Sequence, residues 1–183
     1  MRTGTWFNAE EPGLFELAWK NNEPTVTQNG MPFALARRAD GWLAAEAGAL
    51  EFALRPLRAN PPHSALRVDL GAGRVLIYKK LGRRKPPPVA IEGTYASADS
   101  GAVWHVRRGG RDFTIAVSGP LVAGGAPWTI NGIDSDTIEI VSPPGGWIVP
   151  TQLAHLERDR GGKVKALVVS TGRIKKMRFE RVD

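Results

Sequence analysis

The chain contains no cysteine and only three histidines among its 183 residues. The absence of cysteine excludes disulfide bonds, cysteine-based zinc sites and a thiol nucleophile. No apolar run approaches the ~18 residues that a membrane helix needs. Residues 1–10 show no basic start followed by an apolar core, so they do not have the pattern of a signal peptide. We therefore expect a cytoplasmic protein without a membrane span.

Recognisable catalytic and metal-binding motifs are also missing. No serine is followed by the Ser-x-x-Lys spacing of penicillin-recognising enzymes, and there is no Gly-x-Ser-x-Gly elbow. The histidines lack the His-Glu-x-x-His pair of zinc hydrolases, and His105 beside Trp104 on an alternating segment is typical of a structural histidine. Asp134, Asp136 and Glu139 lack the glycine and terminal glutamate of an EF-hand, so we expect them on an exposed turn. The sequence thus offers no catalytic residue, no metal ligand set and no cofactor site.

Glycine and proline are abundant, with 21 and 14 residues. They fall between short runs in which apolar and polar residues alternate, as at 66–70, 103–108 and 113–117. Turn signals separate these runs, at Asn29-Gly30, Asp40-Gly41, Gly109-Gly110, Asn131-Gly132 and Gly161-Gly162. Strands this short and frequent indicate an all-β chain, folded as an antiparallel sandwich or barrel.

The sequence also indicates an internal duplication. Residues 83–90 combine basic residues with three consecutive prolines, which favours an extended linker. Three matches across this linker suggest two copies of one unit: Gly4-Thr5-Trp6 with Gly93-Thr94-Tyr95, Asp40-Gly41-Trp42 with Asn131-Gly132-Ile133, and Gly73-Arg74-Val75 with Gly172-Arg173-Ile174. We therefore predict a first domain at 1–82, a linker at 83–90 and a second domain at 91–183.

The offset between the copies is 91 positions at Gly41 and 99 at Gly73, which predicts about eight extra residues between Gly132 and Gly172. The natural place is a loop at 142–151, which contains Ser142-Pro143-Pro144-Gly145-Gly146-Trp147 and has no counterpart in the first copy. Proline stiffens such a loop, and long inserted loops are often functional. The same residues also fit an ordinary turn after which Trp147 begins the next strand.

The net charge of +7 permits an anionic partner without requiring one. Basic residues gather in the linker and on the final strand of each half, where lysine discourages edge pairing, so we expect no nucleic-acid binding. Five of the six tryptophans fall in or beside predicted strands and fit a barrel core: Trp6, Trp19, Trp42, Trp104 and Trp128. A small barrel of this kind is either filled by its side chains or holds one ligand.

Two such copies with a short linker resemble the C-terminal domains of the D-aminopeptidases, which belong to the penicillin-recognising (serine β-lactamase-like) hydrolase family. The matching pieces are Gly4-Thr5-Trp6, Gly93-Thr94-Tyr95, the Pro-Pro-Gly-x-Trp loop at 143–147 and the closing strand at 172–182. The resemblance implies two tandem eight-stranded antiparallel β-barrels of the lipocalin or streptavidin kind. It also implies a separate catalytic domain, which carries the Ser-x-x-Lys and Tyr-x-Asn motifs that this chain lacks.

The resemblance further implies a function for the inserted loop. In that family a loop of the last barrel narrows the catalytic cleft and favours short substrates with a free N-terminal D-residue. The corresponding gating residues here are Pro143, Pro144, Gly145, Gly146 and Trp147.

The partner implied is a penicillin-recognising catalytic domain, in cis or in trans, and a second copy of the chain is a further candidate. The first predicted strand begins almost directly after Met1, a departure from the family pattern that indicates either part of a longer protein or a separately encoded one. The alternative function is a stand-alone double barrel that binds a small molecule or a protein.

Overall fold

The structure, a computed structural model, describes residues 3–8, 13–47, 50–57, 64–120, 125–143, 151–171 and 174–183. The chain forms two compact units, Met1–Gly82 and Arg83–Asp183. Both units are built from antiparallel strands, and in the described ranges the only helical segment is the 3-10 turn η1 (Val89–Ile91). The all-β prediction is therefore confirmed. No helix in the part of the chain that the structure describes has the length and apolarity needed to cross a membrane.

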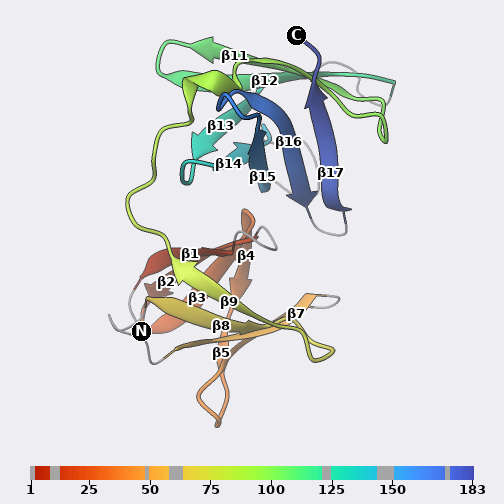
Figure 1. The fold of residues 1–183 in the computed structure, drawn as a ribbon. Helices are drawn as coiled ribbons and strands as arrows, with labels where there is room; N and C mark the ends of the chain where they lie inside the picture. The colour runs from red at the N-terminus through yellow and green to blue at the C-terminus, as the bar shows by residue number, and fades with distance from the viewer. Residues whose placement is uncertain are drawn as a thin grey trace. The chain divides into compact units, whose positions relative to one another are not determined.

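The first unit is a nine-stranded sheet in the order β4-β3-β2-β1-β9-β8-β7-β6-β5 (Figure 1). Its strands are β1 (Gly4–Asn8), β2 (Gly13–Lys20), β3 (Glu23–Gln28), β4 (Met31–Ala34), β5 (Ala36–Arg37), β6 (Leu43–Ala47), β7 (Leu50–Pro56), β8 (Ala65–Asp69) and β9 (Val75–Lys80). The two outermost strands, β4 and β5, are separated in sequence by Leu35 alone, so the sheet curls into a nearly closed barrel. Leu35 is buried, and its amide donates to the Pro24 carbonyl at 3.1 Å. One strand of an eight-stranded barrel is thus split in two.

The second unit is a closed eight-stranded barrel in which each strand pairs with the next and β17 returns to β10. Its strands are β10 (Gly93–Ala96), β11 (Val103–Gly109), β12 (Asp112–Ser118), β13 (Trp128–Gly132), β14 (Thr137–Val141), β15 (Thr151–Arg158), β16 (Val164–Thr171) and β17 (Ile174–Arg181). This is the up-and-down connectivity of lipocalins and streptavidin. The prediction of two tandem barrels is confirmed.

Alternating side chains fill both barrels. In the first, Phe15 meets the rings of Phe52 and Tyr78 edge to face, with centroids 5.3 and 4.8 Å apart. In the second, Trp104 stacks on Phe179 at 4.0 Å. Of the five tryptophans predicted to lie in the core, Trp6 and Trp104 are fully buried, Trp19 and Trp128 pack against the cores partly buried, and Trp42 is half-buried outside them.

The two barrels repeat the same contacts at their closing seam. Trp6 of β1 pairs with Lys80 of β9, and Tyr95 of β10 pairs with Arg181 of β17. In each case the cationic group lies 5.7 Å from the centre of the aromatic ring. The predicted duplication is therefore confirmed at this position, 89 residues apart on the first strand of each copy.

The second sequence match, however, is wrong. Asp40-Gly41 forms the turn between β5 and β6, with Gly41 at φ +82°, whereas Asn131 and Gly132 lie inside β13. Gly132 is needed for a different reason: a Cβ at this position would collide with the carbonyl oxygen of Lys85. Glycine here permits close approach of the linker instead of forming a turn.

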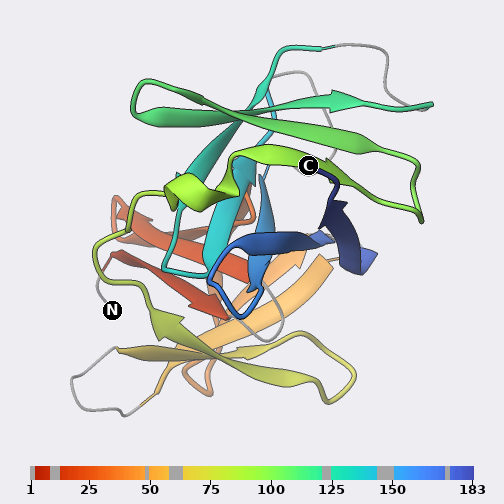
Figure 2. The same ribbon diagram turned by 45° about the horizontal axis from the view of Figure 1, so that its top comes forward.

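The predicted linker, whose path can be followed in Figures 1 and 2, bonds to the second barrel before it enters η1. The Arg84 guanidinium forms an ion pair with the Glu139 carboxylate, which also accepts a hydrogen bond from Asn131 Nδ2 at 3.1 Å. The Lys85 amide donates to the Ile133 carbonyl at 3.5 Å. Glu139 is only 7% exposed, so the prediction that it lies on an exposed turn is wrong. The carboxylate is buried because it neutralises the linker residue Arg84.

Candidate functional site

The second barrel has two unlike ends. One end, here called the loop end, holds the connections β10–β11, β12–β13, β14–β15 and β16–β17. The other end holds the remaining three connections together with the first residues of β10 and the last residues of β17. Any elaboration of the barrel can therefore be assigned to one end from strand register alone.

The β12–β13 connection at the loop end is longer than its counterpart in the first barrel. Val26 pairs with Phe33 in the first barrel, and Ile115 pairs with Trp128 in the second. Ile115 lies 89 positions after Val26, whereas Trp128 lies 95 positions after Phe33. Because the offset rises from 89 to 95 positions, this connection is six residues longer than its counterpart in the first barrel.

The β14–β15 connection, also at the loop end, is lengthened in the same way. Ala45 pairs with Phe52, and Ile140 pairs with Gln152. The offset rises from 95 positions at Ile140 to 100 at Gln152, a gain of five residues. These five residues fall within the loop predicted at 142–151, and they are fewer than the eight predicted from the sequence offsets. The second insertion, in 119–127, was missed because the mismatched glycines concealed it.

The gating residues predicted from sequence belong to the lengthened β14–β15 connection. Pro143 follows Ser142, which is 8% exposed, directly after β14. Pro144, Gly145, Gly146 and Trp147 fall outside the described residues. On the far side, Thr151 is 6% exposed and pairs with Val141, so the loop leaves the barrel from a buried, hydrogen-bonded base.

Partly buried apolar side chains lie in the half of the barrel toward the loop end. They pack against the core while remaining partly open to solvent: Ala102, Val117, Trp128 and Met177. Trp128 meets Trp104 at 5.9 Å, and Trp104 is in turn stacked on Phe179. The three rings therefore form one aromatic cluster in the second barrel.

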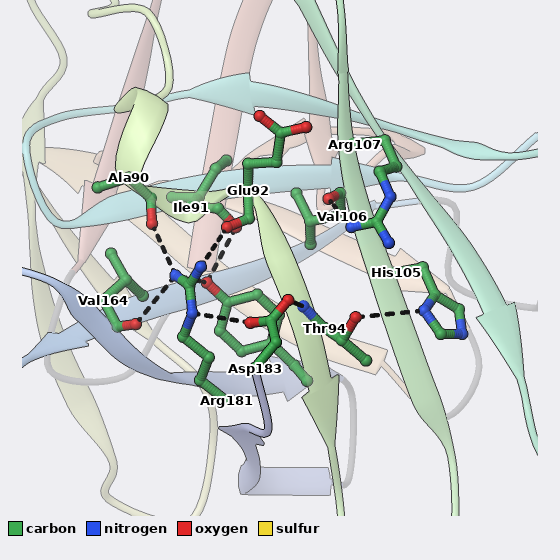
Figure 3. Close-up of polar contacts among 11 residues, drawn as sticks. Ala90, Ile91, Glu92, Thr94, His105, Val106, Arg107, Val164, Arg181 and Asp183 are labelled. Atoms are coloured by element: carbon green, nitrogen blue, oxygen red, sulfur yellow. Dashed lines mark hydrogen bonds and ion pairs between the residues drawn. The ribbon is translucent and has the colours of Figure 1, made fainter.

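At the opposite end Arg181 makes the polar contacts drawn in Figure 3. Its guanidinium donates to the carbonyls of Ala90 at 3.1 Å and Glu92 at 2.6 Å, and to the Asp183 carboxylate at 2.9 Å. The Tyr95 ring lies beneath it, and the Tyr95 hydroxyl donates to the Ile91 carbonyl at 2.9 Å. The bonds to Ala90 and Glu92 tie the last strand to the segment that leads into the first strand.

On the outer face of β10–β12 a serine lies close to a histidine, the two residue types that form the nucleophile and base of many hydrolases. Ser118 Oγ lies 3.4 Å from His105 Nε2, and Thr94 Oγ1 lies 3.5 Å from Nδ1. A nucleophile and its base need to be about 2.6–3.2 Å apart, with a group that orients the base. A threonine hydroxyl does not stabilise an imidazolium as a carboxylate does, and Ser118 is exposed. The contact does not activate the serine.

Metal-ligand candidates are dispersed. Among the residues that the structure describes, no three histidine, aspartate or glutamate side chains come together to hold a metal ion. Asp136 instead bonds Arg158 at 2.9 Å, and Asp134 accepts the Asp136 amide at 2.9 Å. The Arg158 bond is the main reason that the pKa of Asp136 is lowered.

The chain matches no known protein-family model, and no curated protein matches it. Function is therefore inferred from the arrangement of the chain's own residues.

Proposed function

We propose that the chain is the non-catalytic double-barrel region of a D-aminopeptidase-like serine hydrolase. In this proposal the connection at 142–151 restricts the active-site cleft of a penicillin-recognising catalytic domain, held in cis or in trans. The observation that carries the proposal is the pattern of lengthening. A repeated frame has gained residues in two neighbouring connections, both at the loop end of the second barrel. Function commonly resides in loops that a rigid scaffold positions.

The first barrel shows what the unelaborated frame looks like. Its β3–β4 connection is a two-residue turn, with Asn29 at φ 48° and Gly30 at φ 83°. Two positive φ values are typical of the tightest hairpin turns, and the Asn29 side chain accepts a hydrogen bond from the Leu14 amide at 2.9 Å. The equivalent connection of the second barrel, between β12 and β13, is longer.

The lengthened β14–β15 connection is suited to steric selection. Its base is fixed by the Val141–Thr151 pair, and its prolines reduce the entropy lost when the loop is ordered. A stiff loop with a tryptophan excludes long substrates by occupying space, whereas it leaves a dipeptide-sized substrate unaffected. Selection of this kind changes kcat/KM for long substrates relative to short ones.

The partner is tested with an antibody against the chain and a fluorescent penicillin, which acylates penicillin-recognising serines. In native extract the antibody is expected to recover a penicillin-labelled protein, either as one band well above the chain's 19.8 kDa or as a separate co-purifying band. A lone 19.8 kDa band with no labelled partner contradicts the proposal and favours the stand-alone binding protein.

The loop is tested by deleting residues 143–147, which restores the connection length of the first barrel. In the complex recovered above, kcat/KM for longer peptides with an N-terminal D-residue is expected to rise at least about tenfold relative to a dipeptide, equivalent to ~1.4 kcal/mol of lost exclusion. A variant with a shortened 119–127 connection is the matched control. Unchanged selectivity after the deletion contradicts the gating role.

A further inference from the structure

The outer face of β7, β8 and β9 in the first barrel carries two arginines side by side. Arg55 of β7 is paired with Arg67 of β8, which is paired with Ile77 of β9. On the same outer face of β9 lie Val75, Ile77 and Lys79. We call the set Arg55, Arg67, Val75, Ile77 and Lys79 the basic face.

The cations of the basic face are not neutralised within the described residues. Arg55, Arg67 and Lys79 form no ion pair there, and the Arg67 Nε is buried without a hydrogen-bond partner. The one acid on this face of β8, Asp69, uses Oδ1 to accept the Gly71 amide at 2.9 Å. Like charges directly opposite on adjacent strands destabilise a sheet. The arginine pair therefore costs the barrel stability.

The second barrel shows that the same frame accommodates balanced charge. The equivalent row there is His155–Val168–Arg178. Arg178 bonds Glu157 at 2.6 Å and Glu180 at 3.0 Å, and its hydrogen bond is the main reason that the pKa of Glu157 is lowered. The two rows thus differ in charge balance, because the acids that pair with Arg178 in the second barrel are missing from the row in the first.

Apolar surface accompanies the unpaired cations. Ile77 is 42% exposed and Val75 is 36% exposed, although both lie on β9, the central strand of the nine-stranded sheet. The Trp42 ring is covered by the Arg55 guanidinium, which lies 4.6 Å from the ring centre. That ring face is occupied, whereas a nucleic-acid surface needs open aromatic faces for bases to stack on.

We propose that the basic face of the first barrel binds an acidic segment of a partner protein. Carboxylates of the partner accept hydrogen bonds from the two arginines, whose planar fork suits bidentate recognition. Aliphatic groups of the same segment cover Val75 and Ile77. Arginine and exposed aliphatic side chains together are typical of protein interfaces, and three cations are few for a nucleic-acid tract. This surface is on a different barrel from the gating loop, so it stands or falls independently of the proposed function.

The proposal is tested on the full chain by fluorescence anisotropy with a short labelled peptide in which glutamate and valine alternate. A lysine–valine peptide and a single-stranded oligonucleotide are the comparison probes. The Glu–Val peptide is expected to bind more tightly than either and to weaken as salt is raised. The double variant Arg55→Gln/Arg67→Gln is expected to weaken it at least about tenfold. Equal binding of the two peptides, or tighter binding of the oligonucleotide, overturns the proposal.

Arg178→Gln is the matched control, because it removes an arginine from the equivalent row of the second barrel. It is expected to leave peptide binding unchanged and to lower the thermal midpoint, since it breaks two ion pairs. Arg67→Gln is expected to hold or raise the midpoint, since it relieves repulsion. If Arg67→Gln lowers the midpoint as Arg178→Gln does, or binding survives the double variant, the arginines are structural and the proposal fails.

Discussion

Tyr78 and Tyr95 are the two tyrosines of the chain, one in each barrel. Tyr78 is 3% exposed, and its hydroxyl oxygen would lie 2.6 Å from a Cβ built on Gly13. Burial raises the pKa of Tyr78 to about 12 and is only partly opposed by the Arg74 charge. Burial also raises the pKa of Tyr95. Each barrel therefore contains a phenol that resists ionisation while it is folded.

We expect the first barrel to lose stability between about pH 10 and 12. In this range the folded state still holds the Tyr78 proton whereas the unfolded state, with a pKa of 10.0, has released it. Stability therefore falls as pH rises, by about 2–3 kcal/mol in total. Urea unfolding across this range, with tyrosinate absorbance as a second signal, measures the effect.

The matched control for this prediction is Tyr78→Phe, which removes the ionisable group and keeps the ring. Its first-barrel transition should be much less sensitive to alkaline pH, whereas Tyr95→Phe should leave that sensitivity intact. Equal sensitivity in the wild-type chain and Tyr78→Phe would mean that Tyr78 is not the group responsible.

At the scale of the elements, the docking of the linker on the second barrel depends on Gly132. Gly132→Ala would place a methyl group against the Lys85 carbonyl, which is backbone and does not move aside at little cost. We expect it to displace the linker and to destabilise the second barrel by about 1–3 kcal/mol. Hydrogen exchange at the Lys85 amide, which donates to the Ile133 carbonyl, reports the displacement directly.

Gly109→Ala is the matched control, because a Cβ at that strand end meets nothing within 4 Å. It should leave both the unfolding midpoint and Lys85 exchange unchanged. If the two alanine variants behave alike, the close approach at Gly132 does not hold the linker.

Period-two alternation predicted the strands at 66–70, 103–108 and 113–117 correctly, because side chains of a strand alternate between the packed interior and the outside. Glycine was the weaker guide. Gly41 and Gly132 look alike in sequence, but one supplies a positive φ and the other supplies space for another segment. Aligning them concealed the insertion at 119–127, whereas the Pro-Pro-Gly-Gly-Trp composition identified the one at 142–151. The Arg55–Arg67 pair was beyond sequence analysis, since it depends on strand register.

At the scale of the whole molecule, the unit boundary decides which pieces fold well. The second unit begins at Arg83, so a piece covering 83–183 retains the Arg84–Glu139 ion pair. A piece covering 91–183 leaves the buried Glu139 carboxylate without that cation. We expect the shorter piece to be less stable by about 2 kcal/mol, because Arg84 is partly exposed and the pair only half-buried.

Urea unfolding of the two pieces measures this difference. Arg84→Gln in the longer piece is the control and should reproduce much of the loss. Equal stability of 83–183 and 91–183 would show that the linker adds nothing to the barrel on which it packs.

The repeated closing seam has a consequence for how the chain is made. β9 closes on β1, and β17 closes on β10, through the same kind of aromatic–cation pair. During synthesis β9 emerges before β10 exists, so β1 finds its own partner first, and the first unit is complete when the rival seam appears. Refolding from denaturant removes this order, because all four strands then compete at once. Synthesis from the N-terminus therefore lets the first seam form before the second is available.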